Sequence, residues 1–309
     1  MSRHRVRRSA VSASVAAVAV LAGSAAGGAY LTGRSPDHAP AAAASVSSGS
    51  PAATAPAATA PAAAATGEEP VVDRDTELAA AVEPLLTGSG AVSVAVLDTG
   101  TGTRAVYGGA DASYDTASIV KVDILAALLL RAQDEGRELT VGERAHAVAM
   151  IERSDNDSAT ALLAAVGGAA GLDAANARLG LTGTTAAQAW GLTRTTAADQ
   201  LTLLEAVFGT EADAELGAAS RTYLRGLMAQ VEADQQWGVS AAGSDWALKN
   251  GWMPRTATGL WNVNSIGQVT AGGHTVLVAV LSGGQASKET GIALVESVAR
   301  AAVGVVRAG

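Results

Sequence analysis

The 309-residue sequence contains no cysteine, only three lysines and a single phenylalanine. Without cysteine the chain forms no disulfide, carries no thiol nucleophile and has no cysteine-based zinc site. Its four histidines are scattered and lack the spacing of metal ligands: His4, His38, His146 and His274. We therefore expect no metal and no other cofactor.

Basic residues are outnumbered in the globular part of the chain. From Gly67 onward the sequence has 16 basic and 28 acidic residues, a formal charge of −12. Because phosphate groups are bound by basic surfaces, we expect no nucleic-acid partner. Lysine is the scarcest cation, since Lys121, Lys249 and Lys288 stand against eighteen arginines. A lysine in this chain is therefore a specific choice rather than a generic solvated charge.

The first 34 residues have the pattern of an export segment. Residues 1–8 hold four arginines and no acid, and residues 9–31 form a run rich in Ala, Val and Gly that ends in small residues. This pattern is typical of a signal peptide. The run is also near the length that spans a bilayer, so an uncleaved membrane anchor is the alternative. Either way we expect an exported protein, secreted or tethered to the outer face of a membrane.

The next segment has the composition of a linker. Residues 35–66 consist almost entirely of Ala, Pro, Ser and Thr and include the repeat PAATAPAATAPAAAAT. Too few large apolar residues are present to bury a core, so residues 35–70 are predicted to be a disordered linker. Residues 71–309 are predicted to form the catalytic domain, which we expect to be monomeric.

The hydrophobic pattern of this domain changes from strand to helix and back to strand. Strands are predicted at 91–97, 104–107, 246–250, 259–269 and 274–281. Helices are predicted at 75–86, 118–131, 140–151, 158–166, 172–179, 196–207, 220–231 and 289–306. Strands at both ends with helices between them predict an α/β domain, in which one antiparallel sheet is built from both termini and carries a helical layer and an all-helical insertion.

The helix predicted at 118–131 begins with a hydroxyl and an amine one turn apart. If Thr116 caps this helix, Ser118 and Lys121 lie on one face. Free N–H groups and the positive potential of a helix N-terminus favour an alkoxide at the serine and a neutral amine at the lysine. This is an environment for a nucleophile and its base. A Ser-x-x-Lys pair also arises often by chance, so an ordinary exposed helix start is the alternative.

Two further short motifs follow in order along the chain. Ser154-Asp155-Asn156 comes after the helix at 140–151, and Lys249-Asn250-Gly251 lies in a predicted strand. Each has an ordinary explanation, as a helix cap or an edge-strand charge, but the ordered set is hard to reach by accident. The sequence resembles the superfamily of active-site serine hydrolases that contains the class A β-lactamases and penicillin-binding proteins, whose motifs are S-x-x-K, S-D-N and K-T-G. The resemblance covers residues 75–306 and implies the β-lactamase/transpeptidase-like fold.

The resemblance implies a catalytic role for five residues. Ser118 would be the acylated nucleophile, Lys121 its proton acceptor, and Ser154 the donor of a proton to the leaving amine. Asn156 would bind Lys121 and the substrate amide. Lys249 would supply positive potential to Ser154 and to a substrate carboxylate.

The resemblance also implies three substrate-binding residues. Asn250 stands where the family usually has Thr or Ser, and Gly251 would let the strand approach the substrate without a side chain in between. The backbone N–H of Trp252 would complete an oxyanion hole with that of Ser118. The same mapping places three tryptophans near the cleft, as packing or as stacking residues: Trp190, Trp252 and Trp261.

One acid of the family pattern is missing. Class A β-lactamases carry a glutamate that activates the deacylating water in the loop before 195–196, whereas residues 174–198 contain no Asp or Glu. The resemblance therefore implies an atypical member, which forms an acyl-enzyme with a β-lactam or a D-alanyl-type amide or ester and deacylates slowly or by a non-standard route. The alternatives are a β-lactam- or peptidoglycan-binding protein that is acylated without turnover, as a sensor or trap, and an idle domain that retains only the fold.

Overall fold

The computed structural model describes residues 73–308 apart from residues 89, 110 and 213. The leader predicted over 1–34 and the linker predicted over 35–70 lie outside the described residues. Within the described part, no single helix is long and apolar enough to cross a membrane, although the bent helix pair Asn156–Ala165 and Gly168–Arg178 passes a test of length and composition.

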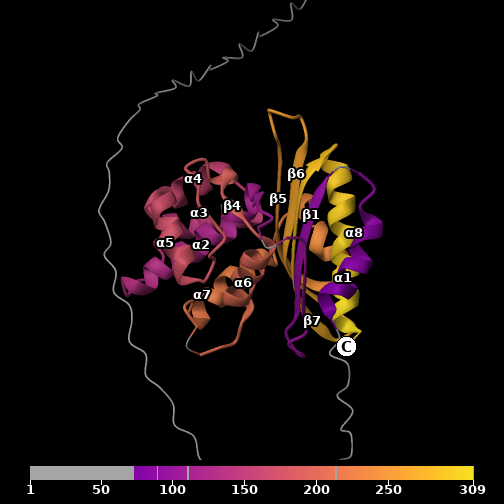
Figure 1. Ribbon diagram of the computed structural model, residues 1–309. Coiled ribbons are helices and arrows are strands. Elements are labelled where there is room, and N and C mark those ends of the chain that lie inside the picture. The colour runs from indigo at the N-terminus through magenta and orange to yellow at the C-terminus, as the bar shows by residue number, and fades with distance from the viewer. Residues whose placement is uncertain (1–72, 89, 110, 213, 309) are drawn as a thin grey trace, which may run out of the picture. The chain divides into compact units, whose positions relative to one another are not determined.

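A five-stranded antiparallel sheet forms the centre of the domain, in the order β2-β1-β7-β6-β5 (Figure 1). Its strands are β1 (Ala91–Asp98), β2 (Arg104–Tyr107), β5 (Ser244–Pro254), β6 (Trp261–Ala271) and β7 (His274–Gln285). The N-terminal hairpin joins the C-terminal strands because β1 pairs with β7 along its whole length. The prediction of one antiparallel sheet built from both termini is confirmed. Two short strands, β3 (Tyr114–Asp115) and β4 (Arg194–Thr195), form a separate ladder.

Helices cover both faces of the sheet (Figure 1). On one face α8 (Lys288–Arg307) packs against β7, β6 and β1, with α1 (Arg74–Val82) beside it. On the other face α6 (Ala197–Phe208) packs against β7 and β1. The remaining helices form the all-helical layer on the α6 side: α2 (Val120–Asp134), α3 (Val141–Glu152), α4 (Asn156–Ala165), α5 (Gly168–Arg178) and α7 (Ala218–Met228).

Strand β1 shows how one sheet serves two hydrophobic cores. Val94 and Val96 pack into the core on the α8 side, whereas Ala95 and Leu97 pack into the core that contains α2. Successive side chains of a strand point to opposite faces, so a strand covered on both sides needs apolar residues at every position. This explains why β1 is a continuous apolar run rather than an alternating one.

Helix α2 is the most buried helix of the helical layer. Twelve of its fifteen residues are buried, in agreement with the apolar pattern on all sides of the predicted helix. Buried residues on every face fix the position of the helix and therefore of the turn at its N-terminal end. That turn carries Ser118.

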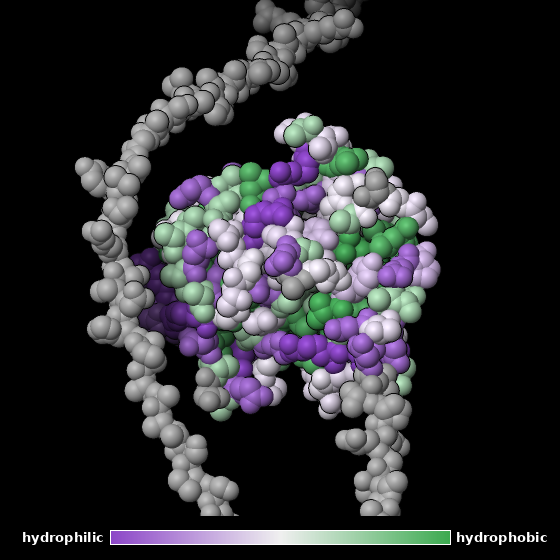
Figure 2. Space-filling model, viewed as in Figure 1, coloured by the Kyte–Doolittle hydropathy of each residue, from purple (hydrophilic) through white to green (hydrophobic). Residues whose placement is uncertain are grey.

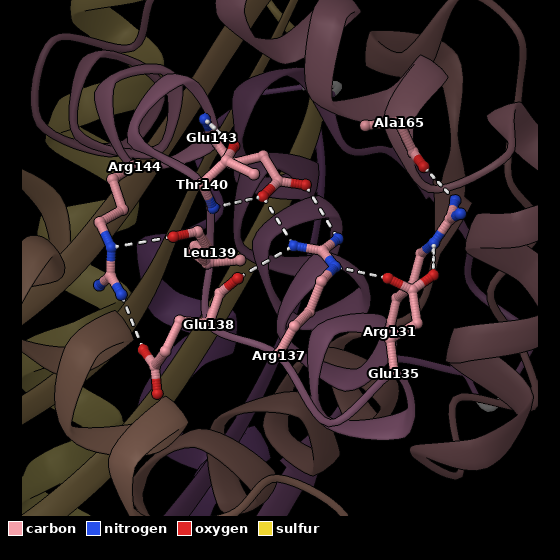
Figure 3. A network of polar contacts seen from close by, with 9 residues as sticks. All are labelled: Arg131, Glu135, Arg137, Glu138, Leu139, Thr140, Glu143, Arg144 and Ala165. Atoms are coloured by element: carbon pink, nitrogen blue, oxygen red, sulfur yellow. Dashed lines mark hydrogen bonds and ion pairs between the residues drawn. The ribbon is translucent and has the colours of Figure 1, made fainter.

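A network of charged side chains connects the end of α2 to the start of α3 (Figure 3). Thr140 and Glu143 form the predicted capping box, in which each accepts from the backbone N–H of the other. Arg137 donates to both carboxylate oxygens of Glu143, at 2.9 and 3.0 Å, and to Glu135. The Arg137 guanidinium holds the pKa of Glu143 at about 2. Every cation of this surface network has an acidic partner in contact.

Part of the apolar surface lies on the α8 side of the domain. Figure 2 shows the most hydrophobic side chains of this face toward the side on which α8 lies. A groove of about 410 Å³ runs beside α8 and is lined in part by Leu85, Leu86, Leu260 and Leu294. None of the predicted site residues lines this groove.

Candidate active site

Ser118 lies in a 3₁₀ turn, η2 (Ala117–Ile119), that leads directly into α2. Ala117 has a positive φ of 48°, which a residue with a side chain adopts only under strain. Thr116 does not cap the helix as expected, because its backbone is itself helical, with φ −63° and ψ −31°. Its hydroxyl donates instead to the carbonyl oxygen of Trp190, at 3.5 Å. The serine is thus held in a strained turn rather than in a regular first turn of α2.

Strand β5 passes directly over this turn at Gly251. A Cβ atom at position 251 would lie 2.7 Å from the backbone nitrogen of Ser118 and from the carbonyl oxygen of Thr116. No side chain fits at that distance, so glycine is required for the strand to lie against the serine turn. The structure shows a close approach to the backbone of the serine itself, and the predicted approach to a substrate stays a prediction.

Ser154 lies between the two buried lysines. Its hydroxyl oxygen accepts a hydrogen bond from Lys121 Nζ at 3.0 Å and another from Lys249 Nζ at 3.1 Å. Ser154 follows α3 with a strained positive φ of 56°, and the next residue, Asp155, caps α4 by accepting from the backbone of Ser158. Within this motif Asp155 is the N-cap of α4, and Ser154 places its hydroxyl between the amines of Lys121 and Lys249.

Lys121 is fully buried, and all of its hydrogen-bond acceptors are uncharged. Nζ donates to the carbonyl oxygen of Ser154 at 2.6 Å, to the hydroxyl of the same residue and to Oδ1 of Asn156 at 2.8 Å. These three acceptors match the three donors of an ammonium group. Burial lowers the pKa of Lys121 to about 8, against an opposing effect of the Asp155 carboxylate.

Lys249 is also fully buried. Besides Ser154, its Nζ donates to the carbonyl oxygen of Asn250 at 2.9 Å and to Oε1 of Gln235 at 3.4 Å. Burial, and secondly the positive charge of Lys121, lower the pKa of Lys249 well below its usual value. Two amines that share a hydroxyl and repel each other favour a state in which one is neutral. Gln235 was not predicted, because no motif marks it in the sequence.

The alternation of β5 separates the residues of the Lys-Asn-Gly segment. Lys249 and Gly251 face the serines, whereas the side chains of Asn250 and Trp252 point to the opposite face. Nδ2 of Asn250 donates to two backbone carbonyls, at 2.7 and 2.9 Å, and the Trp252 ring packs on Trp237 with centroids 5.7 Å apart. Substrate contact by the Asn250 side chain stays a prediction, and the structure does not bring that side chain to the serines.

A cleft of about 380 Å³ opens at Ser118. It is lined by Ser118 and Asn156 together with Trp190, Leu192, Trp252 and Met253, although the Trp252 ring itself packs on Trp237. None of the residues that line the cleft is acidic. Trp261, which was also expected near the cleft, packs instead against the core on the α8 side.

The acids that flank the acid-free segment 174–198, Asp173 and Asp199, accept hydrogen bonds from residues within it. Asp173 accepts a hydrogen bond from the backbone N–H of Ala186 at 2.7 Å. Asp199 accepts from the hydroxyl of Thr184 at 2.6 Å. Both carboxylates are therefore committed to the loop.

Comparisons with known proteins agree on the fold. A family model described as the β-lactamase enzyme family matches residues 130–306, a range that starts after Ser118 and Lys121 and includes the two later motifs. A class A β-lactamase from Bacteroides cellulosilyticus has a TM-score of 0.67 at 17% identity, covering 77% of this chain and 100% of that chain. An ancestral class A β-lactamase has a TM-score of 0.60 at 25% identity, covering 76% and 100%.

An acyl-enzyme complex of a mutant of PBP-A with penicillin G is also similar. Its TM-score is 0.63 at 20% identity, and the match covers 78% of this chain and 99% of that chain. No curated protein sequence matches the chain. The described domain therefore shares its fold with both class A β-lactamases and PBP-A.

Proposed function

The chain belongs to the β-lactamase enzyme family, and from this premise we propose that its serine hydrolase domain is acylated at Ser118 by a β-lactam or a D-alanyl-type amide or ester. The observation that carries the proposal is the Ser154 hydroxyl, which accepts hydrogen bonds from both Lys121 and Lys249. A single hydroxyl in contact with both amines provides a path for a proton across the site. Ser118 opens onto the adjoining cleft, where a substrate carbonyl would bind.

The first step joins the serine to the substrate. Ser118 Oγ attacks the carbonyl carbon, and its proton passes to the neutral amine of Lys121. With a pKa of about 8, about one tenth of Lys121 is neutral at pH 7, whereas an ordinary lysine is almost wholly charged. The backbone N–H groups of Ser118 and Trp252 are proposed to stabilise the oxyanion.

The second step releases the amine. The C–N bond breaks, and the leaving nitrogen takes the proton of the Ser154 hydroxyl. Ser154 is reprotonated by Lys121, which gives up the proton that it took from Ser118, so the net products are an ester at Ser118 and a free amine. Lys249 is proposed to attract a substrate carboxylate, and Asn156 to bind the substrate amide.

Release of the acyl group requires a water molecule and a base. Because no acid lines the cleft, we propose that ester hydrolysis is slow or uses Lys121 as its base. The same observation favours the second candidate function, a β-lactam- or peptidoglycan-binding protein that remains acylated as a sensor or trap.

Intact-mass spectrometry with penicillin G tests acylation. The expected result is a covalent adduct on the wild-type protein that is lost in Ser118→Ala. Ser297→Ala, which removes a hydroxyl from α8 outside the cleft, is the matched control and should form the adduct normally. A long-lived adduct supports the trap, and released penicilloate supports the hydrolase. A wild-type protein that forms no adduct contradicts both and leaves the idle domain.

We propose separately that residues 1–34 direct export, with the domain secreted or tethered outside the membrane. The support is the four arginines within residues 1–8, followed by 23 apolar and small residues. Cell fractionation and the mass of the recovered protein test it. Full-length protein found only in the cytoplasm would contradict the proposal, and loss of about 34 residues, as expected for signal-peptide cleavage, would exclude the uncleaved anchor.

A further inference from the structure

Trp190 covers the amine that serves as the base. It lies in the 3₁₀ turn η3 (Trp190–Leu192), within the acid-free segment, and lines the cleft together with Ser118. The centroid of its ring is 4.8 Å from Lys121 Nζ, within the range of a cation–π contact. Lys121 is wholly buried although Ser118, one turn away, is partly exposed. The indole ring is a large side chain that both lines the cleft and lies over this lysine.

The ring is fixed by contacts at both ends. Its Nε1 donates to the hydroxyl of Thr160 on α4 at 3.2 Å, and that hydroxyl donates to the carbonyl oxygen of Asn156 at 3.1 Å. The backbone carbonyl of Trp190 accepts from the N–H of Thr193 at 3.0 Å and from the Thr116 hydroxyl beside the serine turn. Asn156 itself binds Lys121. The ring is therefore connected through Thr160 to Asn156, which binds the Lys121 amine.

These contacts surround the amine. Three uncharged acceptors use the three donors of Lys121, and the face of the indole ring lies against the same nitrogen. Hydrolysis of an ester at Ser118 needs a water molecule whose proton a base removes as its oxygen attacks the acyl carbon. A ring over Lys121 Nζ takes up space that such a water molecule would need beside the base.

We propose that Trp190 is a positioning residue that excludes water from Lys121 and thereby sets the lifetime of the acyl-enzyme. The proposal rests on the acylation of Ser118 proposed above. In the absence of the ring, water occupies the space beside Lys121, transfers a proton to the neutral amine and attacks the acyl carbon. The C–Oγ bond then breaks, and Ser118 Oγ takes the proton from Lys121, which regenerates the free enzyme and releases an acid.

The decay of the penicillin G adduct, followed by intact mass, tests this role. Trp190→Ala is expected to shorten the lifetime by about tenfold or more, equivalent to 1.4 kcal/mol in barrier height. Trp190→Phe keeps an aromatic face over the amine and should stay close to wild type. Trp246→Ala removes a half-buried tryptophan of β5 outside the cleft lining and is the matched control. An unchanged lifetime in a folded Trp190→Ala protein overturns the proposal.

A second measurement needs no acyl-enzyme. Acetic anhydride labels neutral, water-accessible amines, and peptide mass spectrometry quantifies each lysine, with Lys288 as the internal reference. Labelling of Lys121 should rise severalfold in Trp190→Ala and stay at the wild-type level in Trp190→Phe. If penicillin G forms no adduct but Lys121 labelling rises, the proposal that penicillin G acylates Ser118 is refuted, whereas the proposal that Trp190 shields Lys121 is supported. If labelling does not rise, the shielding itself is refuted.

Discussion

Arg137 and Lys121 lie near opposite ends of α2, and their partners differ in charge. Arg137 contacts the carboxylates of Glu135 and Glu143 at the surface (Figure 3). Lys121 is buried and donates its hydrogen bonds to a carbonyl, a hydroxyl and an amide oxygen. Carboxylate partners raise the pKa of the arginine, whereas burial among uncharged acceptors lowers the pKa of the lysine to about 8. Only the second arrangement brings a cation close to losing its proton near neutral pH.

The comparison separates charges that stabilise from charges that react. A solvated ion pair adds little to stability because water already screens each partner. A buried amine without a counter-charge is costly to the fold, and that cost is what makes its proton easy to remove. The helical layer contains both kinds of charge. Arg137 and Lys121 share no hydrogen-bond partner, so a substitution can change one without removing a contact of the other.

Lys121→Arg gives the largest expected effect. The substitution keeps a cation in the site, but a guanidinium does not lose its proton in proteins, so it cannot act as the base. The rate of adduct formation with penicillin G should fall by about 10³-fold, within the range for loss of a general base. Lys288→Arg is the control, because Lys288 contacts the Trp252 ring rather than a serine. A Lys121→Arg protein that is acylated at the wild-type rate would show that positive charge alone suffices.

Gly251→Ala is expected to separate the strand from the serine turn. The added Cβ would lie 2.7 Å from the Ser118 backbone nitrogen, so the strand or the turn has to move. A displacement of about 1 Å at reacting groups costs about 10²-fold in rate, and overpacking costs about 1–3 kcal/mol in the free energy of unfolding. Stopped-flow assays measure the rate of acylation, and urea denaturation measures the free energy of unfolding. Gly226→Ala on α7, where a Cβ meets nothing within 4 Å, is the matched control; equal behaviour of the two variants would contradict the close approach.

The rate of acylation should also depend on pH through Lys121. With a pKa of about 8, the neutral fraction of the amine increases about tenfold between pH 7 and pH 9, and the rate should follow it and then level off. Free lysine keeps its proton to about pH 10.4, so the unfolded state binds more protons over the window from about 8 to 10.4. The contribution of Lys121 to the free energy of unfolding therefore rises with pH across that window. A rate that is constant from pH 6 to 9 would exclude Lys121 as the base.

The sequence predicted the elements of this domain more completely than their contacts. The return strand at 104–107 has its predicted bounds, and the capping box of Thr140 and Glu143 is present, because both depend on residues close together in the chain. The sheet was also predicted, since strands at both ends of a domain have few other ways to be covered. Thr116 was wrong as a helix cap because a contact 74 residues away, with Trp190, competes for its hydroxyl.

In the candidate site, too, local motifs were predicted and contacts between distant segments were not. The three motifs identified the residues around Ser154, since each motif is local. The position of Gln235 beside Lys249 depends on how the segment before β5 folds back, and no pattern marks it. The direction of the Asn250 side chain depends on strand alternation together with the approach of Gly251 to the serine turn, which only the folded chain defines.

Glu143→Gln gives the smallest expected effect and tests the surface side of the comparison. Glutamine keeps the acceptor that the capping box needs but removes the charge that faces Arg137. The free energy of unfolding at pH 7 should fall by less than about 1 kcal/mol, as for other surface pairs, and the rate of acylation should not change.

The pKa of Glu143 is lowered from 4.5 to about 2, so its contribution to the free energy of unfolding is complete above pH 4.5 and is lost as the pH falls through 2. Urea denaturation at a series of pH values should therefore show the two proteins converging in stability toward pH 2. A difference that is independent of pH would mean that packing, not charge, distinguishes them, whereas a slower acylation would show that the surface network and the buried lysine are coupled through α2.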